Sequence, residues 1–257
     1  MHAPPTPFTP TLHDADIENI ERATLDAVVP AAVEAFNDWL LPSDPSTIGR
    51  ATSAVPLRHH HMGPADIARI AAHYVALGSR PAFRVADVPG LGAIHRELER
   101  LGYKAHQPTL VQAGSASRMR ALFQVLPSRV SNAPYPEWAR VYQAEGFDPV
   151  DGAQRVRALS RSRNAVYACV LEDDNALAAG TAAFSHGWAS IHGMRTVQSS
   201  RGRGLAGRVL AGLSQAALDR GLERVFLQVE EGNLGALALY QRCGFVTVWR
   251  YHYWRLP

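Results

Sequence analysis

The hydrophobic pattern of the first half of the chain alternates between helical and strand-like spacing. Apolar residues recur as on one face of an α-helix in three segments: 14–29, 64–77 and 91–101. Shorter apolar runs bounded by turn residues predict four strands: 38–42, 48–57, 82–86 and 109–112. Residues 1–13 are rich in proline and predict a loose N-terminal tail. This alternation of helices and strands is typical of an α/β fold.

The second half of the chain shows the same kind of pattern. Helical spacing over 136–145 and 151–160 precedes two apolar runs, 165–171 and 176–184. These runs flank the turn-forming segment Glu172–Asn175 and predict a hairpin. Four further strands are predicted, the last of them as an aromatic edge strand: 119–125, 188–196, 224–230 and 250–254. Helices are predicted after Gly204 and before Gly244.

A shift of 143 residues aligns the two halves with each other. It places similar residues together: Arg58 on Arg201, Ile67 on Leu210, Gly78 on Gly221 and Phe83 on Phe226, although Val85 falls on Gln228. Later in the repeat the shift is one residue smaller, so that 99–103 falls on 241–245 and Leu98 on Tyr240. We interpret the match as an internal repeat, with one unit at 14–127 and the other at 128–257. The alternative is that two unrelated α/β segments share their element spacing.

A glycine loop, Arg201–Ala206, lies between a predicted strand and a predicted helix. Gly202 and Gly204 allow the backbone to approach a ligand closely. The first N–H groups of the following helix have no partner inside the helix and attract anions. The sequence therefore predicts a pyrophosphate-binding loop. Neither the P-loop pattern of NTPases nor the G-x-G-x-x-G order of dinucleotide-binding folds is present in the sequence.

The order of this loop, a strand, Asn233, and a helix with Tyr240 ahead of Gly244-Phe245 resembles the GNAT superfamily of acyl-CoA-dependent N-acyltransferases. The resemblance implies two α/β units, each with a mixed, mostly antiparallel central sheet flanked by helices. It implies acetyl-CoA as the cosubstrate, held by residues from three segments: Met194, Arg195, Thr196, Val197, Arg201, Gly202, Arg203, Gly204, Leu205, Ala206, Asn233 and Tyr240. It also implies that Tyr240 lies near the thioester sulfur and acts as the general acid. From the residues alone, a packed aromatic side chain is the alternative for Tyr240.

Two residues are candidates for the general base that takes the proton of the attacking amine. His192 lies on the strand before the glycine loop and titrates near neutral pH. Glu230 ends the following strand, where partial burial would raise its pKa. Alternatively, His192 is an ordinary polar residue on an open strand face, and Glu230 is a carboxylate that caps a turn. A relay of water molecules is the third possibility for removing the amine proton.

The N-terminal unit lacks the residues that the C-terminal unit would use. His59 and His61 stand where the second unit has Gly202 and Gly204, and Leu98 stands at the position of Tyr240. We therefore expect a degenerate copy of the acyltransferase unit. The run His59–His61 has no cysteine or carboxylate at ligand spacing, so a solvated loop is favoured over a metal site.

Composition narrows the range of functions. The formal charge of +3 and the pI near 9.1 suit an anionic cofactor, while scattered arginines argue against nucleic-acid binding. Two cysteines in 257 residues favour a reducing, cytoplasmic setting over a disulfide framework. No segment of the sequence has the length and hydrophobicity of a membrane span or the layout of a signal peptide.

These observations predict an N-acetyltransferase that moves an acetyl group from acetyl-CoA directly to a primary amine, without a metal. A non-catalytic acyl-CoA-binding regulatory module is the alternative from another class. The acceptor stays open among an amino acid, a polyamine, an antibiotic and a protein N-terminus. We expect a small-molecule or peptide amine as partner, and a monomer or a homodimer.

Overall fold

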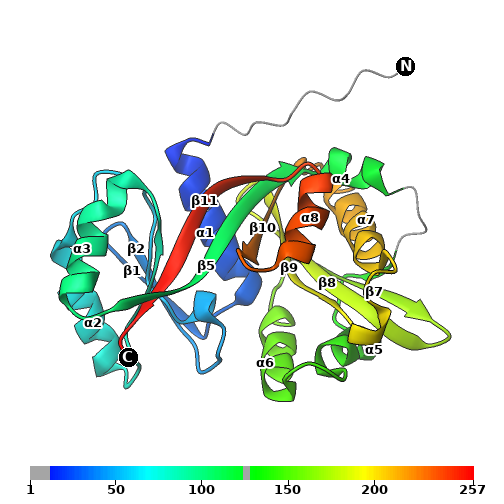
Figure 1. Ribbon diagram of the computed structural model, residues 1–257, viewed down its shortest axis with the longest axis horizontal. Coiled ribbons are helices and arrows are strands. Elements are labelled where there is room, and N and C mark those ends of the chain that lie inside the picture. The colour runs from blue at the N-terminus through cyan, green and yellow to red at the C-terminus, as the bar shows by residue number, and fades with distance from the viewer. Residues whose placement is uncertain (1–11, 124–127) are drawn as a thin grey trace.

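The computed structural model describes residues 12–123 and 128–257, so nearly all of the expected tail lies outside it. One mixed eight-stranded sheet runs through the molecule in the order β4-β11-β5-β10-β9-β8-β7-β6 (Figure 1). Its strands are β4 (Ala82–Ala86), β5 (Lys104–Ser115), β6 (Arg129–Ser131), β7 (Ala165–Glu172), β8 (Asn175–Ser185), β9 (Trp188–Thr196), β10 (Arg224–Glu230) and β11 (Val246–Arg255). Only β9 and β10 pair in parallel within this sheet. The predicted mixed, mostly antiparallel sheet is confirmed.

Helices cover both faces of the sheet. They are α1 (Asp14–Val28), α2 (Ile67–Ala76), α3 (Gly92–Arg100), α4 (Ala116–Leu122), α5 (Pro136–Arg140), α6 (Pro149–Leu159), α7 (Leu205–Leu218) and α8 (Leu234–Arg242). Over β7, β8 and β9, helices α5 and α6 lie on one face and α7 on the other (Figure 1). A small sheet of β1 (Ala32–Phe36), β2 (Trp39–Ser43) and β3 (Val55–Pro56) lies at the N-terminal end. No helix in the described ranges is long and apolar enough to cross a membrane.

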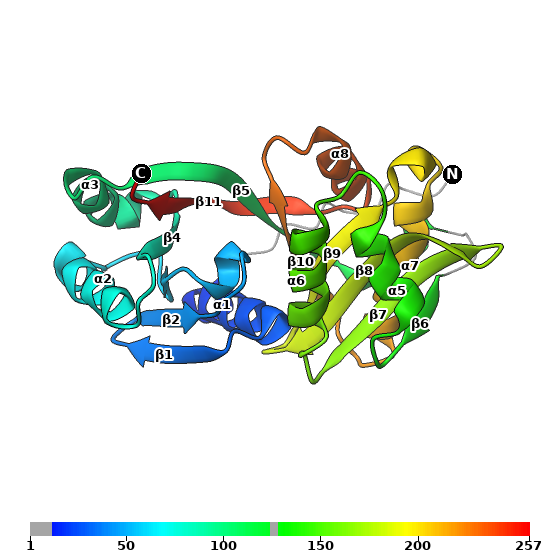
Figure 2. The same cartoon turned by 90° about the horizontal axis from the view of Figure 1, so that it is seen from below.

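The last strands of the two halves are exchanged. β5 ends the first half but pairs with β10 of the second, and β11 ends the second half but pairs with β4 of the first. Figure 2 shows β5 and β11 running side by side between the two ends of the molecule. The prediction of an edge strand at 250–254 is therefore wrong, because β11 has a hydrogen-bonded neighbour on each side.

The backbone supports the proposed repeat at three aligned positions. His61 has a φ of +56°, and its counterpart Gly204 has a φ of +75°. Two glycine pairs also share left-handed φ values: Gly78 (+69°) with Gly221 (+70°), and Gly102 (+87°) with Gly244 (+80°). Left-handed backbone is uncommon, so its recurrence at aligned positions favours a common unit over chance spacing. We propose on this basis that 14–127 and 128–257 are two copies of one unit that share a sheet.

Two other strand predictions are wrong. Residues 116–122 form helix α4 instead of a strand, because the Ser115 side chain caps it by accepting from the Arg118 amide at 3.2 Å, and Met119 is buried. The remainder of that predicted strand, 124–125, lies outside the described residues. Of the strand predicted at 48–57, Val55–Pro56 pair with β2 and Ala54 forms an isolated parallel bridge with Phe83, while Gly49–Ala51 form a 3₁₀ turn packed on the Tyr253 ring. The other predicted elements are present, with boundaries shifted by a few residues.

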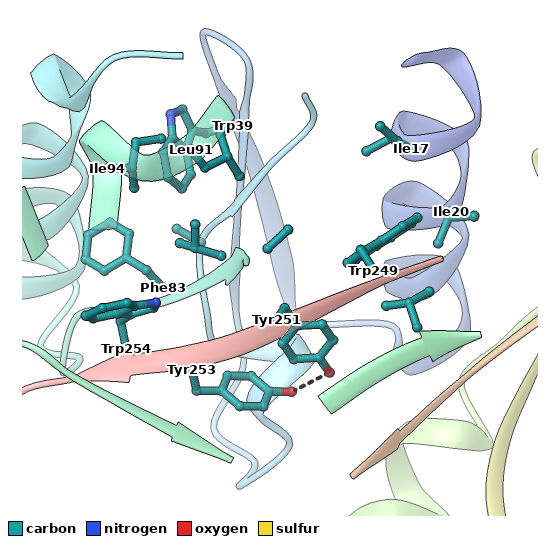
Figure 3. Close-up of a cluster of buried hydrophobic side chains, with 14 of the residues drawn as sticks. Ile17, Ile20, Trp39, Phe83, Leu91, Ile94, Trp249, Tyr251, Tyr253 and Trp254 are labelled. Atoms are coloured by element: carbon teal, nitrogen blue, oxygen red, sulfur yellow. Dashed lines mark hydrogen bonds between the residues drawn. The ribbon is translucent and has the colours of Figure 1, made fainter. Parts of the chain in front are cut away.

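Helix α1 is fixed to the sheet by a buried ion pair. Glu21 Oε2 accepts from Arg84 Nη2 of β4 at 2.5 Å, and the two side chains are only 3% and 1% exposed. The Arg84 guanidinium also lies over the Tyr251 ring of β11, 5.2 Å from its centroid. Figure 3 shows Ile17 and Ile20 of α1 beside Trp249 in the same core. The pair thus joins α1, β4 and β11, which come from both ends of the chain.

Replacing Glu21 with Gln should lower the free energy of unfolding by about 3–5 kcal/mol, because it leaves the Arg84 charge buried without a counter-charge. Urea unfolding followed by circular dichroism measures the change in midpoint. Glu18→Gln is the matched control on the same helix, because the Glu18–Arg22 pair is exposed and should contribute less than about 1 kcal/mol. Equal losses in the two variants would contradict a special role for the buried pair.

Candidate active site

The central feature of the site is the separation of β9 from β10. The two strands pair only between Ala189–Ile191 and Val225–Leu227. Beyond these residues β9 continues to Thr196 and β10 to Glu230 without further pairing to each other. A cleft of about 990 Å³ opens there, lined by His192–Thr196 on one side and Leu227–Glu230 on the other.

A bulge turns the β9 backbone at this point. The pairing register of β8 and β9 shifts between Ala179 and Thr181, and Gly193 has a φ of +62°. The Tyr142 hydroxyl donates to the Gly193 carbonyl at 2.7 Å, and the Trp138 indole donates to the Gly180 carbonyl at 3.2 Å. These side chains hold the carbonyls of both strands, so the bulge is fixed before any ligand binds.

The predicted pyrophosphate loop borders the cleft at the start of α7. Gly202 and Gly204 have φ values of +78° and +75°, and a Cβ on either would meet no atom within 4 Å. The amides of Leu205 and Ala206 donate to no backbone carbonyl in the described part of the chain. Open space in front of free amides at a helix N-terminus suits a phosphate group.

Most of the residues predicted to hold CoA line this cleft. They are Met194, Arg195, Thr196, Arg201, Gly202, Gly204, Leu205, Ala206, Asn233 and Tyr240. Arg203 does not line it, because its Nη2 pairs with Glu172 Oε2 at 2.5 Å. Val197 does not line it either, and its amide donates to the Leu177 carbonyl.

Asn233 and Tyr240 belong to α8, which follows β10. The Asn233 side chain caps the helix by accepting from the Ala236 amide at 3.2 Å. Tyr240 is 7% exposed, and its hydroxyl forms no hydrogen bond with a described residue. Burial raises the pKa of Tyr240, and the nearby Cys243 adds to the shift. The hydroxyl therefore keeps its proton at neutral pH and is able to donate it.

The two base candidates lie in different environments. His192 is 2% exposed, and neither ring nitrogen has a partner within the described residues. Burial, and then the charge of Arg50, hold the pKa of His192 well below its usual value, so its ring is neutral. Glu230 is exposed, and its Oε1 accepts from Gln107 Nε2 at 3.1 Å. The partial burial expected for Glu230 is wrong, because this carboxylate is exposed at the end of β10, past the part of the strand that pairs with β9.

Comparison with known proteins identifies the family. Residues 14–254 match the family described as "Probable histone acetyltransferase Rv0428c C-terminal". The chain belongs to this acetyltransferase family. The recognition of a GNAT superfamily member from the sequence is thereby confirmed.

Curated relatives match shorter segments of the chain. An uncharacterized N-acetyltransferase, YobR, of Bacillus subtilis (strain 168) is 28% identical over 116 residues, or 43% of this chain and 45% of the relative. The N-alpha-acetyltransferase MAK3 of Arabidopsis thaliana is 42% identical over 59 residues, or 23% of this chain and 31% of the relative. The matches therefore span less than half of each curated relative.

Solved structures share the fold of this chain over nearly its whole length. A GCN5-related N-acetyltransferase from Kribbella flavida has a TM-score of 0.69 at 16% identity, and the match covers 94% of this chain and 95% of that structure's chain. A tandem GNAT protein from the clavulanic acid biosynthesis pathway has a TM-score of 0.58 at 15% identity, with coverage of 95% and 96%. Both matches extend across the two proposed units.

Part of the cleft is lined by residues that the sequence did not single out. They come from the segment before and within the first 3₁₀ turn, from β5 and from β11: Thr47, Ile48, Gly49, Arg50, Gln107, Thr109, Tyr251, Tyr253 and Arg255. The exchange of β5 and β11 brings the residues of these two strands to the cleft, and the 3₁₀ turn packs against Tyr253 of β11. The aromatic and basic composition of β11 was the one local signal, and it was interpreted as an edge strand.

Gly204→Glu should abolish CoA binding while leaving the fold intact, because the side chain has open space that the pyrophosphate would occupy. Calorimetric titration with CoA measures the loss. Gly187→Glu in the β8–β9 turn is the matched control, since Gly187 also has a φ of +75° and no atom near its Cβ position. CoA binding that survives Gly204→Glu would contradict the placement of the pyrophosphate.

Proposed function

We propose that this protein is an N-acetyltransferase that transfers the acetyl group of acetyl-CoA directly to a primary amine in a ternary complex. The observation that carries the proposal is the cleft between β9 and β10, which brings the glycine loop, Tyr240 and His192 to one space. The family and the curated relatives are named as acetyltransferases, which favours catalysis over a purely regulatory acyl-CoA-binding module.

The glycine loop and β9 would position the donor. The free amides of Leu205 and Ala206, with Arg201 beside them, would bind the pyrophosphate of CoA. The unpaired backbone of β9 past Ile191 offers hydrogen-bonding groups to the pantetheine arm, in the manner of an added strand. The thioester would then lie between the β9 bulge and Tyr240.

The reaction needs two proton movements. The acceptor must be a neutral amine, whose nitrogen forms a bond with the thioester carbon while the carbon–sulfur bond breaks. The nitrogen loses a proton to a base, and the departing thiolate gains one. We assign the second proton to the Tyr240 hydroxyl, whose raised pKa keeps it protonated. The products are an N-acetylated amine and free CoA.

His192 is the better candidate for the base. It is buried at the point where the two strands separate, its ring is neutral, and both nitrogens lack a partner among the described residues. Glu230 is exposed and already accepts from Gln107. A buried neutral imidazole beside the separation of the strands is positioned to take a proton directly, whereas Glu230 would need a water relay.

Direct transfer agrees with the state of the two thiols. Cys169 and Cys243 are free and buried, and burial raises the pKa of each to about 12. Neither thiol is ionised at neutral pH, so neither is activated for a covalent acetyl-enzyme intermediate. Free thiols also agree with the proposed cytoplasmic setting.

Tyr240→Phe should lower kcat by about 10²-fold with little change in the affinity for CoA, because it removes only the proton donor. Thiol release measured with excess amine gives kcat, and calorimetry gives the affinity. Tyr103→Phe is the matched control, because Tyr103 is also buried but lies in the N-terminal core away from the cleft. A parallel loss of CoA affinity in Tyr240→Phe would show a binding role instead.

His192→Gln should lower kcat by about 10²-fold, and Glu230→Gln by less than about threefold, at saturating substrates. Since burial keeps the pKa of His192 well below 6.5, the wild-type kcat should not fall through this group between pH 8 and about pH 6. A large effect of Glu230→Gln with a small effect of His192→Gln would transfer the role to Glu230 and a relayed water.

A further inference from the structure

The end of the cleft away from the glycine loop is built from residues distant in sequence. We call it the acceptor end and define it by Arg50, Gln228, Tyr251, Tyr253 and Arg255, all of which line the cleft. Gln228 is joined to β11 and α1, because its Oε1 accepts from the Tyr251 hydroxyl at 2.9 Å and its Nε2 donates to Thr24 Oγ1 at 2.8 Å.

The two tyrosine hydroxyls form a polar pair at this end. Figure 3 shows Tyr251 and Tyr253 with their hydroxyls directed at each other, at an O–O distance of 3.4 Å. Both rings are buried, at 2% and 6% exposed. The acceptor end is therefore a fixed polar surface in the protein without a ligand.

Two guanidinium groups at the acceptor end lack a carboxylate partner in the described part of the chain. Arg50 Nη1 reaches only Gln228 Oε1, at 3.5 Å. The Cζ atom of Arg255 lies 5.1 Å from the centroid of the Tyr253 ring. Its Nη2 lies close to Gly49, 3.1 Å from the position that a Cβ atom would take on that glycine. The Arg255 head group thus lies against the turn that carries Arg50, and neither guanidinium has a carboxylate partner among the described residues.

Two other arginines of the cleft share one carboxylate, whereas Arg201 of the glycine loop and Arg242 of α8 have no carboxylate partner among the described residues. Arg195 Nη2 and Arg155 Nε both contact Asp151 Oδ2, at 2.6 and 2.7 Å. Among the described residues that line the cleft, Glu230 is the only carboxylate, and it accepts from Gln107 at the end of β10. A polycationic acceptor would meet two uncompensated guanidiniums and no acidic patch.

The acceptor end also adjoins the proposed base. Ile191 and Leu227 are the last paired residues of β9 and β10, so His192 and Gln228 are the next residues on the two strands. Arg50 is near enough for its charge to lower the pKa of His192. A negatively charged group of the acceptor substrate, if bound to Arg50, would therefore lie beside His192, the proposed base for the amine proton.

We infer that the acceptor is a small amine carrying a carboxylate on the same molecule, an amino-acid-like compound, whose carboxylate binds Arg50 and Arg255 while its amine faces His192. A guanidinium presents paired N–H donors that match the two oxygens of a carboxylate. This inference rests on the proposed acetyl transfer and names its substrate class.

The test compares each of the twenty amino acids with its α-amide and its decarboxylated amine, alongside spermidine and a lysine-rich peptide. Thiol release from acetyl-CoA gives kcat/KM, and calorimetry on the protein saturated with CoA gives binding without turnover. We expect at least one acid to exceed its amide and its decarboxylated amine by about tenfold or more. In Arg50→Gln and Arg255→Gln the acid-to-amide ratio should fall toward one, whereas in Arg157→Gln, on the exposed side of α6, it should not change.

The outcomes separate this inference from the function on which it rests. Absence of both CoA binding and thiol release would overturn the proposed acetyltransferase. Preferred acetylation of spermidine or the lysine-rich peptide would support acetyl transfer but overturn the carboxylate acceptor. The carboxylate acceptor would also be overturned if acids and amides bound the CoA complex equally well. The same holds if neither bound it.

Discussion

The short parallel pairing of β9 with β10 is the constraint on which the site depends. Three residues of each strand hold the two together, and beyond Ile191 and Leu227 they separate. The bulge at Gly193, held by Tyr142, turns β9 away and leaves its backbone unpaired toward β10. Because α7 follows β9 and α8 follows β10, the N-termini of both helices lie at the same opening. The end of the pairing between β9 and β10 therefore brings the glycine loop, Tyr240 and His192 to the same cleft.

The other wall of the cleft depends on contacts between residues far apart in sequence. β5 and β11 exchange places between the halves, and α1 is held by the buried pair of Glu21 with Arg84. Gln228 connects these parts, since it bonds Thr24 of α1 and Tyr251 of β11. Residues on both sides of the proposed boundary thus form one cleft, and neither half would supply it alone.

The sequence predicted what is determined locally. The hairpin around Glu172–Asn175, the strand leading to the loop and the free amides after Gly204 follow from turn residues and helix ends within a few positions. The sequence did not predict elements whose conformation or position depends on residues far away in the chain. Residues 116–122 are helical because Ser115 caps them and α7 buries Met119, and β11 is internal because β4 and β5 both pair with it. Arg50 and Arg255 were missed for the same reason, since Arg255 lies on the exchanged strand β11 and Arg50 in a turn that packs against that strand.

The two copies differ in the loop before the helix, and we expect only the loop of the second copy to bind a phosphate group. His61 keeps the left-handed backbone of its counterpart Gly204, so the shape of the loop persists. We expect no phosphate site there, because imidazole side chains stand where the second copy has Gly202 and Gly204. His59, aligned with Gly202, packs its ring 4.9 Å from Trp249 of the exchanged strand. Strand β11, which lines the proposed acceptor end, thus also packs against the loop of the first copy.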